Sequence, residues 1–523
     1  MIRKIICINS AVFIVLAALL FIYPVARAFL SLQDPALQQR GIPKMAWRLA
    51  RNVTPRYGDW ARDRVANARP EGLSLDNISG TEWPLFGSVF YLWAMENLQA
   101  TWDAGDHTPG VEPRVFAKDA IVAASELVID PRHAAWVRKH WGDDYLHREN
   151  VFYRMLVIAA LTSRQKLLHD GTHLDMLRDQ VETFSAELDA SSSGLLNDYP
   201  SQCYPGDVMA STACIQRADA VLGTDHSKFV SHALRGFVGG NASRHQLPPY
   251  FADAKTGRPR SDARGCGNSY MCQLAPELWP GEAKLWYQAY DKFFWQERWT
   301  AAGYREFAND RPGGNWMMDV DAGPVIGGYG LSACAFGIGA ARRNGRFDRA
   351  YPLTAEMIAT VWELPNGVMA VPRLLSNFGD APLLGEAGIL WQLTVQPEQG
   401  FPIRSGGSLP IYVYIVLIIA LLFGIWRIFE SILTIKLIRH EPEPVVPAAA
   451  FQSVCWVGLM AGALVTIWTA PWWVSVVLLL VALCLPLTSR KRPKDDVDEW
   501  GIPPAQTAGT QEQQPKEQGK ATQ

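Results

Sequence analysis

The sequence lacks the features that mark several common classes of protein. Its 49 basic residues nearly balance its 51 acidic residues, which gives a formal net charge of −2. A chain so close to neutrality has no electrostatic reason to bind nucleic acid or another acidic polymer. The sequence also contains no glycine-rich phosphate loop and no G-x-S-x-G motif, so it carries neither the usual nucleotide-binding signature nor that of a serine hydrolase.

Metal ligands at a suitable spacing are missing as well, and so are strand patterns. His133 and His140 are heptad-spaced, but no third ligand follows at a spacing typical of a metal site. Alternation of polar and apolar residues, which would indicate strands, is rare between the N-terminal and C-terminal apolar segments. We therefore expect no metal site and a fold built mainly of helices.

Four long segments carry almost no charge. The first begins at Ile5, and the others cover residues 409–429, 451–469 and 472–489. The first is long enough to cross a hydrocarbon core about 30 Å thick, and we expect an uncleaved transmembrane anchor. A cleaved signal peptide is the alternative, because Ala26–Ala28 forms a small-x-small site, but the apolar run is longer than a usual signal core.

Clusters of basic residues indicate the orientation of these segments. With four crossings, all the clusters fall on one side of the membrane, which the positive-inside rule makes cytoplasmic. The clusters are Arg3 with Lys4, then Arg427, Lys436 and Arg439, then residues 490–494. We therefore expect an inner-membrane protein with both termini in the cytoplasm and its main domain outside the cytoplasm, in the periplasm if the cell is Gram-negative.

These segments divide the chain into four parts. We expect an N-terminal anchor over residues 1–29, an exported domain over 30–408, three transmembrane helices over 409–488 and a cytoplasmic tail over 489–523. The tail is polar and rich in glutamine and proline, so we expect it to be disordered.

Helical periodicity dominates the exported domain. Apolar residues recur at the 3.6-residue spacing of helices in successive segments, separated by loops rich in glycine, proline and aspartate. Ten to twelve helices in hairpin succession predict an all-α domain, and specifically an (α/α)6 toroid with its site in a funnel at the helix N-termini. An α-solenoid is the alternative, although no repeat of fixed length is visible.

Five cysteines lie in the exported domain, where disulfides can persist. Cys266 and Cys272 flank a short segment with glycine on both sides of Cys266, so we expect a disulfide between them. An odd number then remains, namely Cys203, Cys214 and Cys334. A Cys203–Cys214 bridge would require the intervening loop to fold back along the next helix, so the bridged and free forms both stay open.

Two motifs in the exported domain carry a resemblance. The segment RENVFYRMLVIAALTSRQKL, residues 148–167, and a later spaced pair of cysteines resemble the linalool dehydratase/isomerase family. The resemblance implies an (α/α)6 fold, a site of acid/base side chains with cysteines, and no metal or organic cofactor. It assigns Asn150 and Tyr153 to the helix motif, and Cys203 and Cys214 to the cysteine pair.

The sequence departs from that family pattern at two positions and in one spacing. Leu156 occupies the place of the family's functional histidine, and Tyr204 follows the first cysteine where an acidic residue is expected. The gap between the two cysteines is also slightly longer than in the family.

The stretch from residue 197 to residue 219 holds the first candidate site. Asp207 is placed to cap a helix beginning at Val208, where the helix dipole would hold its carboxylate ionised. We expect the stretch to line the mouth of the funnel, and the structural alternative is a capping aspartate with a small cysteine in the core. The candidate catalytic residues are Asp207, Cys203 and Cys214, and the candidate substrate contacts are Asp198, Tyr199 and Tyr204.

A second candidate site lies in the glycine-rich segment 315–330. Asp319 and Asp321 are two residues apart, so in an extended loop their carboxylates point the same way. Such proximity would push their pKa values apart and provide one general acid and one general base. A glycine-rich turn with capping aspartates is the structural alternative.

Four other residues complete the candidate site. Glu82 and Trp83 come just before a predicted helix and would contact the substrate, as would Tyr153 on the motif helix. His147 stands at the entry to that helix and is the candidate proton shuttle, with a solvated loop histidine as the alternative.

The sequence therefore favours a membrane-anchored exported enzyme with cofactor-free acid/base chemistry. The Asp207 loop would face Asp319 or Asp321 across the funnel. Dehydration or isomerisation of a small alcohol or terpenoid is the first reaction type, and hydrolysis or elimination of an envelope glycan is the second. A non-catalytic domain that binds a glycan or an envelope protein is the third alternative. The expected partners are a small-molecule or glycan substrate and the lipid bilayer, with no nucleic acid.

Overall fold

The computed structural model describes residues 2–67, 75–107, 110–440, 446–469 and 472–484. Helices dominate this part of the chain and the strands are few and short, so the all-α prediction is confirmed at the level of fold class. The predicted cytoplasmic tail, residues 489–523, lies outside the described residues.

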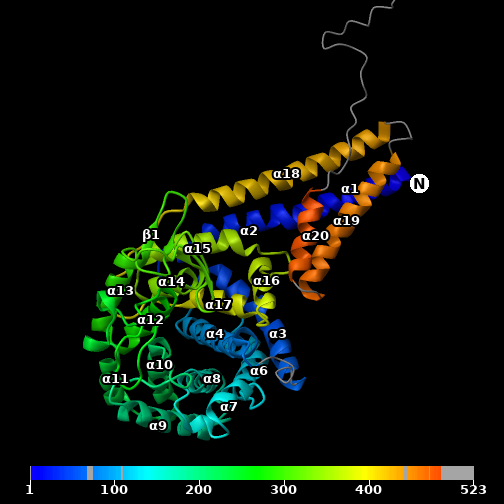
Figure 1. Ribbon diagram of the computed structural model, residues 1–523. Coiled ribbons are helices and arrows are strands. Elements are labelled where there is room, and N and C mark those ends of the chain that lie inside the picture. The colour runs from blue at the N-terminus through cyan, green and yellow to red at the C-terminus, as the bar shows by residue number, and fades with distance from the viewer. Residues whose placement is uncertain (1, 68–74, 108–109, 441–445, 470–471, 485–523) are drawn as a thin grey trace, which may run out of the picture.

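Six helices form the inner layer of the domain. Each packs against the next along the chain, and the last of them packs against the first (Figure 1). A helix enclosed by neighbours on all sides is apolar all round, and in α8 every residue from Val151 to Gln165 is buried. The six are α4 (Ile78–Asp103), α8 (Val151–Leu168), α10 (Pro205–Leu222), α12 (Gly265–Leu278), α14 (Leu331–Arg343) and α17 (Leu384–Thr394).

Outer helices alternate with the inner ones along the chain. They are amphipathic, as α13 illustrates: its buried residues Ala283, Trp286, Tyr290 and Phe294 recur every three or four positions and form one stripe. The outer helices are α3 (Lys44–Ala66), α6 (Lys118–Ile129), α9 (Leu174–Ala190), α11 (Ser227–Ala233), α13 (Pro280–Phe294), α15 (Phe347–Val361) and α16 (Ala370–Phe378). Short helical segments join these elements: η2 (Pro35–Leu37), α5 (Pro113–Phe116), α7 (Ala135–Trp141), η4 (Tyr145–His147), η5 (Leu234–Gly236), η6 (Gly239–Asn241) and η7 (Arg244–Gln246).

The segment 315–330 forms three short antiparallel strands, of which the first two make a β-hairpin, and not the loop that the sequence predicts. Asp319 at the end of the first strand pairs with Gly323 at the start of the second, which places Asp321 in the tight turn between them. Gly323 has φ +65°, a left-handed conformation that glycine adopts without strain. Strands of four residues are too short to leave a readable alternation in the sequence. The strands are β3 (Trp316–Asp319), β4 (Gly323–Ile326) and β5 (Tyr329–Gly330), and a separate pair is β1 (Trp295–Glu297) with β2 (Ala302–Tyr304).

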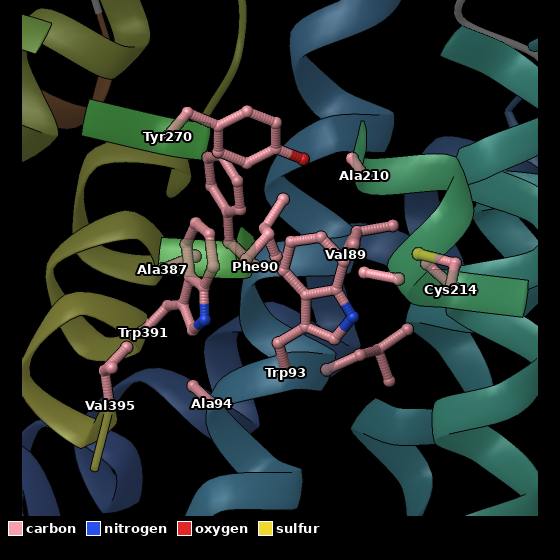
Figure 2. Close-up of a cluster of buried hydrophobic side chains, with 14 of the residues drawn as sticks. Val89, Phe90, Trp93, Ala94, Ala210, Cys214, Tyr270, Ala387, Trp391 and Val395 are labelled. Atoms are coloured by element: carbon pink, nitrogen blue, oxygen red, sulfur yellow. The ribbon is translucent and has the colours of Figure 1, made fainter. Parts of the chain in front are cut away.

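Aromatic side chains fill the space between the inner helices. The ring of Phe90 on α4 stacks on that of Trp391 on α17, with centroids 4.9 Å apart and planes 16° apart. Trp93 contacts the same Trp391 ring at 4.8 Å. Figure 2 shows these three rings gathered with Tyr270 of α12, while Cys214 of α10 turns its sulfur toward the same cluster. The inner helices therefore enclose a packed core and not an open channel.

Two long helices meet the length and hydropathy expected of membrane spans. They cover residues Ile6–Leu32 and Ile411–His440, in agreement with the first and second predicted crossings. The first comprises α1 (Ile2–Ala17), the π-helical turn η1 (Ala18–Ile22) and α2 (Tyr23–Leu32), and the second is α18 (Ile411–His440). The third and fourth predicted crossings are helical as α19 (Val446–Thr469) and α20 (Trp472–Cys484), of which α19 contains a shorter apolar helix from Val454 to Thr466.

Polar contacts join the first long apolar helix to the domain. Arg27 of α2 pairs with Glu363 at 3.7 Å, and the same carboxylate binds Arg48 of α3 at 2.7 Å. The indole of Trp362 donates a hydrogen bond to the carbonyl of Leu20 in η1 at 2.8 Å. The domain is therefore attached to the first long helix by side chains as well as by chain continuity.

The packing of the aromatic core predicts a large loss of folding stability when its central ring is removed. We expect Trp391→Ala to lower the free energy of unfolding by about 3–5 kcal/mol, because the cavity lies between helices that cannot collapse into it. Denaturant unfolding of the detergent-solubilised chain, followed by circular dichroism, measures the change. Leu285→Ala on the exposed face of α13 is the matched control and should stay within about 0.5 kcal/mol of the parent chain. Equal losses in the two variants would contradict this account of the core.

Candidate functional site

The N-terminal ends of three inner helices bring two acids and a cysteine together at one end of the domain. Glu82 belongs to the start of α4, Asp207 to the first turn of α10, and Cys266 to the first turn of α12. The hairpin turn adds Asp321, whose charge acts on all three of these groups. We call Glu82, Asp198, Asp207 and Asp321 the carboxyl cluster.

Glu82 is a buried carboxyl group with a tyrosine partner. Its residue is 9% exposed, and the hydroxyl of Tyr199 donates a hydrogen bond to its Oε1. Burial, opposed by the Tyr199 hydrogen bond and assisted by the charge of Asp321, raises the pKa of Glu82 to about 7. The helix α4 begins at Ile78, so Glu82 lies inside the helix and not before it as the sequence predicts.

Asp207 differs from the sequence prediction in both its helix position and its protonation state. The helix α10 begins at Pro205 with Tyr204 at the cap position, so Asp207 is the third helical residue and not the cap. Burial raises the pKa of Asp207 to about 8, with added repulsion from Asp321 and Glu82. The prediction of an ionised carboxylate is therefore wrong, because burial and two like charges outweigh the helix dipole.

Asp198 lies deepest in the carboxyl cluster. It is 2% exposed, and its Oδ2 accepts a hydrogen bond from the backbone N–H of Tyr204 at 2.7 Å. Its Oδ1 is buried and has no hydrogen-bond partner in the described part of the chain. Burial, and then the charges of Asp207 and Glu82, raise its pKa well above the usual carboxyl range. Asp198 is therefore held as a neutral acid within the carboxyl cluster.

Asp319 and Asp321 have opposite pKa shifts, as the sequence predicts. Partial burial acts to raise the pKa of Asp319, but hydrogen bonds from the backbone of Ala322 and from Arg264 hold it below its ordinary value. Loss of solvation raises the pKa of Asp321, although Tyr250 donates a hydrogen bond to it, and the charge of Asp319 raises it further. Asp321 is nevertheless the most solvent-exposed residue of the carboxyl cluster.

Arg264 organises the hairpin side of the site. Its Nε binds Glu306 at 2.6 Å and its Nη1 binds Asp319 at 3.2 Å, while its guanidinium lies 4.3 Å from the centre of the Tyr250 ring. Glu306 is fully buried and also accepts hydrogen bonds from the backbone and the thiol of Cys266. Sequence reasoning missed Arg264, Glu306 and Tyr250, because they come from separate loops and form no motif.

The predicted Cys266–Cys272 disulfide is wrong. Both are free thiols on the single helix α12. Six residues along a helix rise about 9 Å, whereas disulfide-bonded Cα atoms are typically about 5.5–6 Å apart. The short spacing that suggested a bridge in a loop is incompatible with one in a helix.

Cys203 and Cys214 are also free thiols, which answers the question that the sequence left open. Burial raises the pKa of the Cys203 thiol, and the charges of Asp198 and Asp207 add to the effect. Burial raises the pKa of Cys214 to about 12, and its side chain belongs to the aromatic core. Cys203 therefore borders the carboxyl cluster as a neutral thiol, whereas Cys214 packs as a core residue.

The remaining predicted residues have different positions. His147 is exposed and binds Asp144 at 3.0 Å and Asp179 at 3.1 Å, and neither partner belongs to the carboxyl cluster. Tyr153 is buried and donates to the carbonyl of Val128 at 3.0 Å, in the core between α6 and α8. Trp83 lies against Gly379 at the end of α16. Tyr204 remains at the site, where its ring contacts that of Tyr250 at 5.5 Å.

An aromatic floor lies next to the carboxyl cluster, formed by Phe86, Phe90, Tyr270 and Phe336. Phe86 and Phe90 follow Glu82 at four-residue intervals on α4, so all three occupy one face of the helix. The ring of Phe86 lies 5.9 Å from that of Tyr270, which lies 5.6 Å from that of Phe336. Phe86 and Phe336 are only partly buried, so the floor offers an apolar surface beside the acids.

Ion pairs occupy the opposite ends of the same inner helices. Arg217 binds Glu277 at 2.6 Å, and Arg343 binds the same carboxylate at 3.0 Å. Lys166 pairs with Glu96 at 3.2 Å. These acids have basic partners, whereas Glu82, Asp207 and Asp321 have no basic partner at ion-pair distance among the described residues. The two ends of the inner layer therefore differ in charge balance.

The raised pKa values predict that acid stabilises the fold. Glu82 and Asp207 keep their protons in the folded state where the unfolded chain has lost them, so their contribution is complete below the ordinary carboxyl pKa. It is lost as the pH rises through about 7 for Glu82 and about 8 for Asp207. We expect the thermal unfolding midpoint to fall between about pH 5 and about pH 8.

Two variants separate this effect from general acid stability. Asp207→Asn should reduce the fall, because the amide cannot ionise. Asp319→Asn should destabilise the chain at both pH values, because the lowered pKa of Asp319 makes its ionised form stabilising above the ordinary carboxyl pKa. An unchanged pH dependence in Asp207→Asn would contradict the assignment.

Comparisons with known proteins do not add a family to this description. A scan against protein-family models and a search of curated proteins found no match to the sequence. The resemblance to the linalool dehydratase/isomerase family stays a prediction.

Proposed function

We propose that the domain is an enzyme that performs acid/base chemistry with carboxyl side chains. The observation that carries the proposal is the shared position of Glu82, Asp207 and Asp321. Two of them have pKa values of about 7 and about 8, which lie where a general acid or base works best at neutral pH. Burial of so many acids without basic partners lowers stability, so a functional role explains their presence better than packing does.

We also propose the finer architecture. The closed succession of α4, α8, α10, α12, α14 and α17, with outer helices between them, supports an (α/α)6 toroid. The two long apolar helices, together with α19 and α20, support four crossings of the inner membrane with the domain exported to the periplasm. In this arrangement the carboxyl cluster lies at the funnel end of the toroid.

The roles of the acids follow from their protonation. Asp207 is protonated at neutral pH and serves as the general acid, giving its proton to a substrate hydroxyl as the C–O bond breaks and water leaves. Asp321 serves as the base, because it is the most accessible acid and Tyr250 donates to its carboxylate. It takes a proton from the neighbouring carbon, and the electrons of that C–H bond form the double bond. Addition of water in the reverse sense at another carbon gives isomerisation.

The surroundings indicate the chemical class of the substrate. Phe86 and Phe336 offer apolar surface beside the acids, which suits the hydrocarbon body of a small alcohol or terpenoid. An anionic substrate would meet carboxyl groups and raise their pKa values further. The favoured substrate is therefore uncharged, with a hydroxyl group on an apolar skeleton, and the proposed class is a dehydratase or isomerase.

Glycan cleavage is the second candidate function. Tyr204 and Tyr250 border Asp321 with their rings 5.5 Å apart, and aromatic rings at the mouth of an acidic site suit sugars. Two carboxyl groups would then act on a glycosidic bond, with a separation of about 5 Å for retention and about 6.5–9.5 Å for inversion. A panel of alcohols and envelope oligosaccharides distinguishes the two functions by the product released.

Substitution of the two proposed catalytic acids tests the enzyme assignment. We expect Asp207→Asn and Asp321→Asn each to lower kcat/KM by about 10²–10⁴-fold on the substrate that the panel identifies, because proton transfer contributes that much. Mass spectrometry of the products measures turnover. Asp143→Asn, a highly exposed aspartate on another loop, is the matched control and should retain full activity. A binding domain would instead show no turnover in the parent chain with any member of the panel.

The protonation state of Asp207 also predicts the pH dependence of the reaction. Since the general acid must carry its proton, kcat/KM should fall as the pH rises through about 8. Initial rates between about pH 5 and about pH 10 measure this fall in kcat/KM. Asp319→Asn should leave the pH at which kcat/KM falls nearly unchanged, because Asp319 does not carry the proton. A rate that continues to rise beyond pH 8 would exclude Asp207 as the acid.

A further inference from the structure

The helix α16 (Ala370–Phe378) has its polar and apolar faces reversed relative to a helix that covers a core. Its inward side is polar and buried: Arg373 binds Glu386 of α17 at 2.8 Å, and the Ser376 hydroxyl accepts a hydrogen bond from the N–H of Gly385 at 2.9 Å. Its outward side is apolar, with Leu375 55% exposed and Phe378 59% exposed. A helix in water would present the opposite arrangement.

The apolar positions of α16 form one continuous stripe. Val371, Leu374, Leu375 and Phe378 are spaced three or four residues apart, which places them on a single face. Nine residues rise about 14 Å, too short to cross a bilayer but long enough to lie along its surface. Helices of this kind bury their apolar face in the boundary between lipid headgroups and acyl chains.

The surroundings of α16 identify what covers the exposed part of this stripe around Leu375. The helix packs against α20, the most apolar of the C-terminal helices, and lies beside it in Figure 1. The partner that covers the stripe therefore continues from the surface of an apolar helix. A second soluble protein would not require the stripe to adjoin a membrane-spanning segment, whereas a bilayer around α20 would.

We infer that the outward face of α16 inserts into the outer leaflet of the membrane, with lipid acyl chains as its partner. The inference rests on the proposed insertion of the apolar helices and extends it to an element of the exported domain. Because Trp83 lies against Gly379 at the end of α16 and adjoins Glu82, the helix links the membrane surface to the carboxyl cluster. An amphiphilic substrate dissolved in the membrane would then approach the site beside α16.

Collision accessibility of a spin label tests the position of α16. The full chain carrying Leu375→Cys is labelled with a nitroxide and reconstituted in nanodiscs of phosphatidylcholine and phosphatidylglycerol. Its relaxation by oxygen, which concentrates in lipid, is compared with relaxation by a water-soluble nickel chelate. The matched control is Leu285→Cys on α13, a leucine of nearly equal exposure, 58%, on an element distant from α20 in Figure 1. The chain without an added cysteine gives the signal of native thiols, which is subtracted.

We expect the ratio of oxygen to nickel accessibility at Leu375→Cys to exceed that at Leu285→Cys by about threefold or more, as an apolar face within the interface requires. Leu374→Cys, on the same face of α16, should behave like Leu375→Cys and guards against a local disturbance at one position. Equal ratios at all three positions would overturn the inference. Extraction at alkaline pH separates the two proposals: a chain released from vesicles refutes membrane insertion itself, whereas a retained chain with an aqueous Leu375→Cys label refutes only the position of α16.

Discussion

Several carboxyl groups that share a poorly solvated space cannot all be ionised. Around Glu82, Asp207 and Asp321 the packed ends of α4, α10 and the hairpin remove water, and each charge raises the pKa of its neighbours. Arg264 neutralises Asp319 and leaves those three acids uncompensated. Protons must therefore remain in the site at neutral pH, and every proposed chemical role follows from where they remain.

Much of this site was predictable from the sequence because acids at helix starts are visible as a local pattern. The sequence predicts Glu82, Asp198 and Asp207 near helix starts and Asp321 in a glycine-rich loop, and the structure brings these four together. It also predicted that Asp319 and its neighbour would differ in pKa, since two adjacent acids interact whatever the fold. The helical class was predictable for the same reason, because a 3.6-residue period is a local property.

The errors arose where long-range packing decides the outcome. The ionised state of Asp207 was predicted from its own helix, yet burial and acids from two other elements reverse it. The Cys266–Cys272 bridge was predicted from spacing, but the pair forms part of a continuous helix. Arg264 and Glu306 were not predicted as partners because a pair 42 residues apart forms no local motif. They meet where Gly265 approaches the backbone of Arg305 closely.

The contacts of the first long helix bear on whether its N-terminal segment survives processing. Cleavage after Ala28 would remove Arg27 and leave Glu363 with one basic partner, and it would strip the Leu20 carbonyl from the indole of Trp362. It would also expose the apolar surface that Val25 and its neighbours now cover. The first long helix is thus bound to the domain by side chains, and cleavage after Ala28 would leave the surface of the domain incomplete.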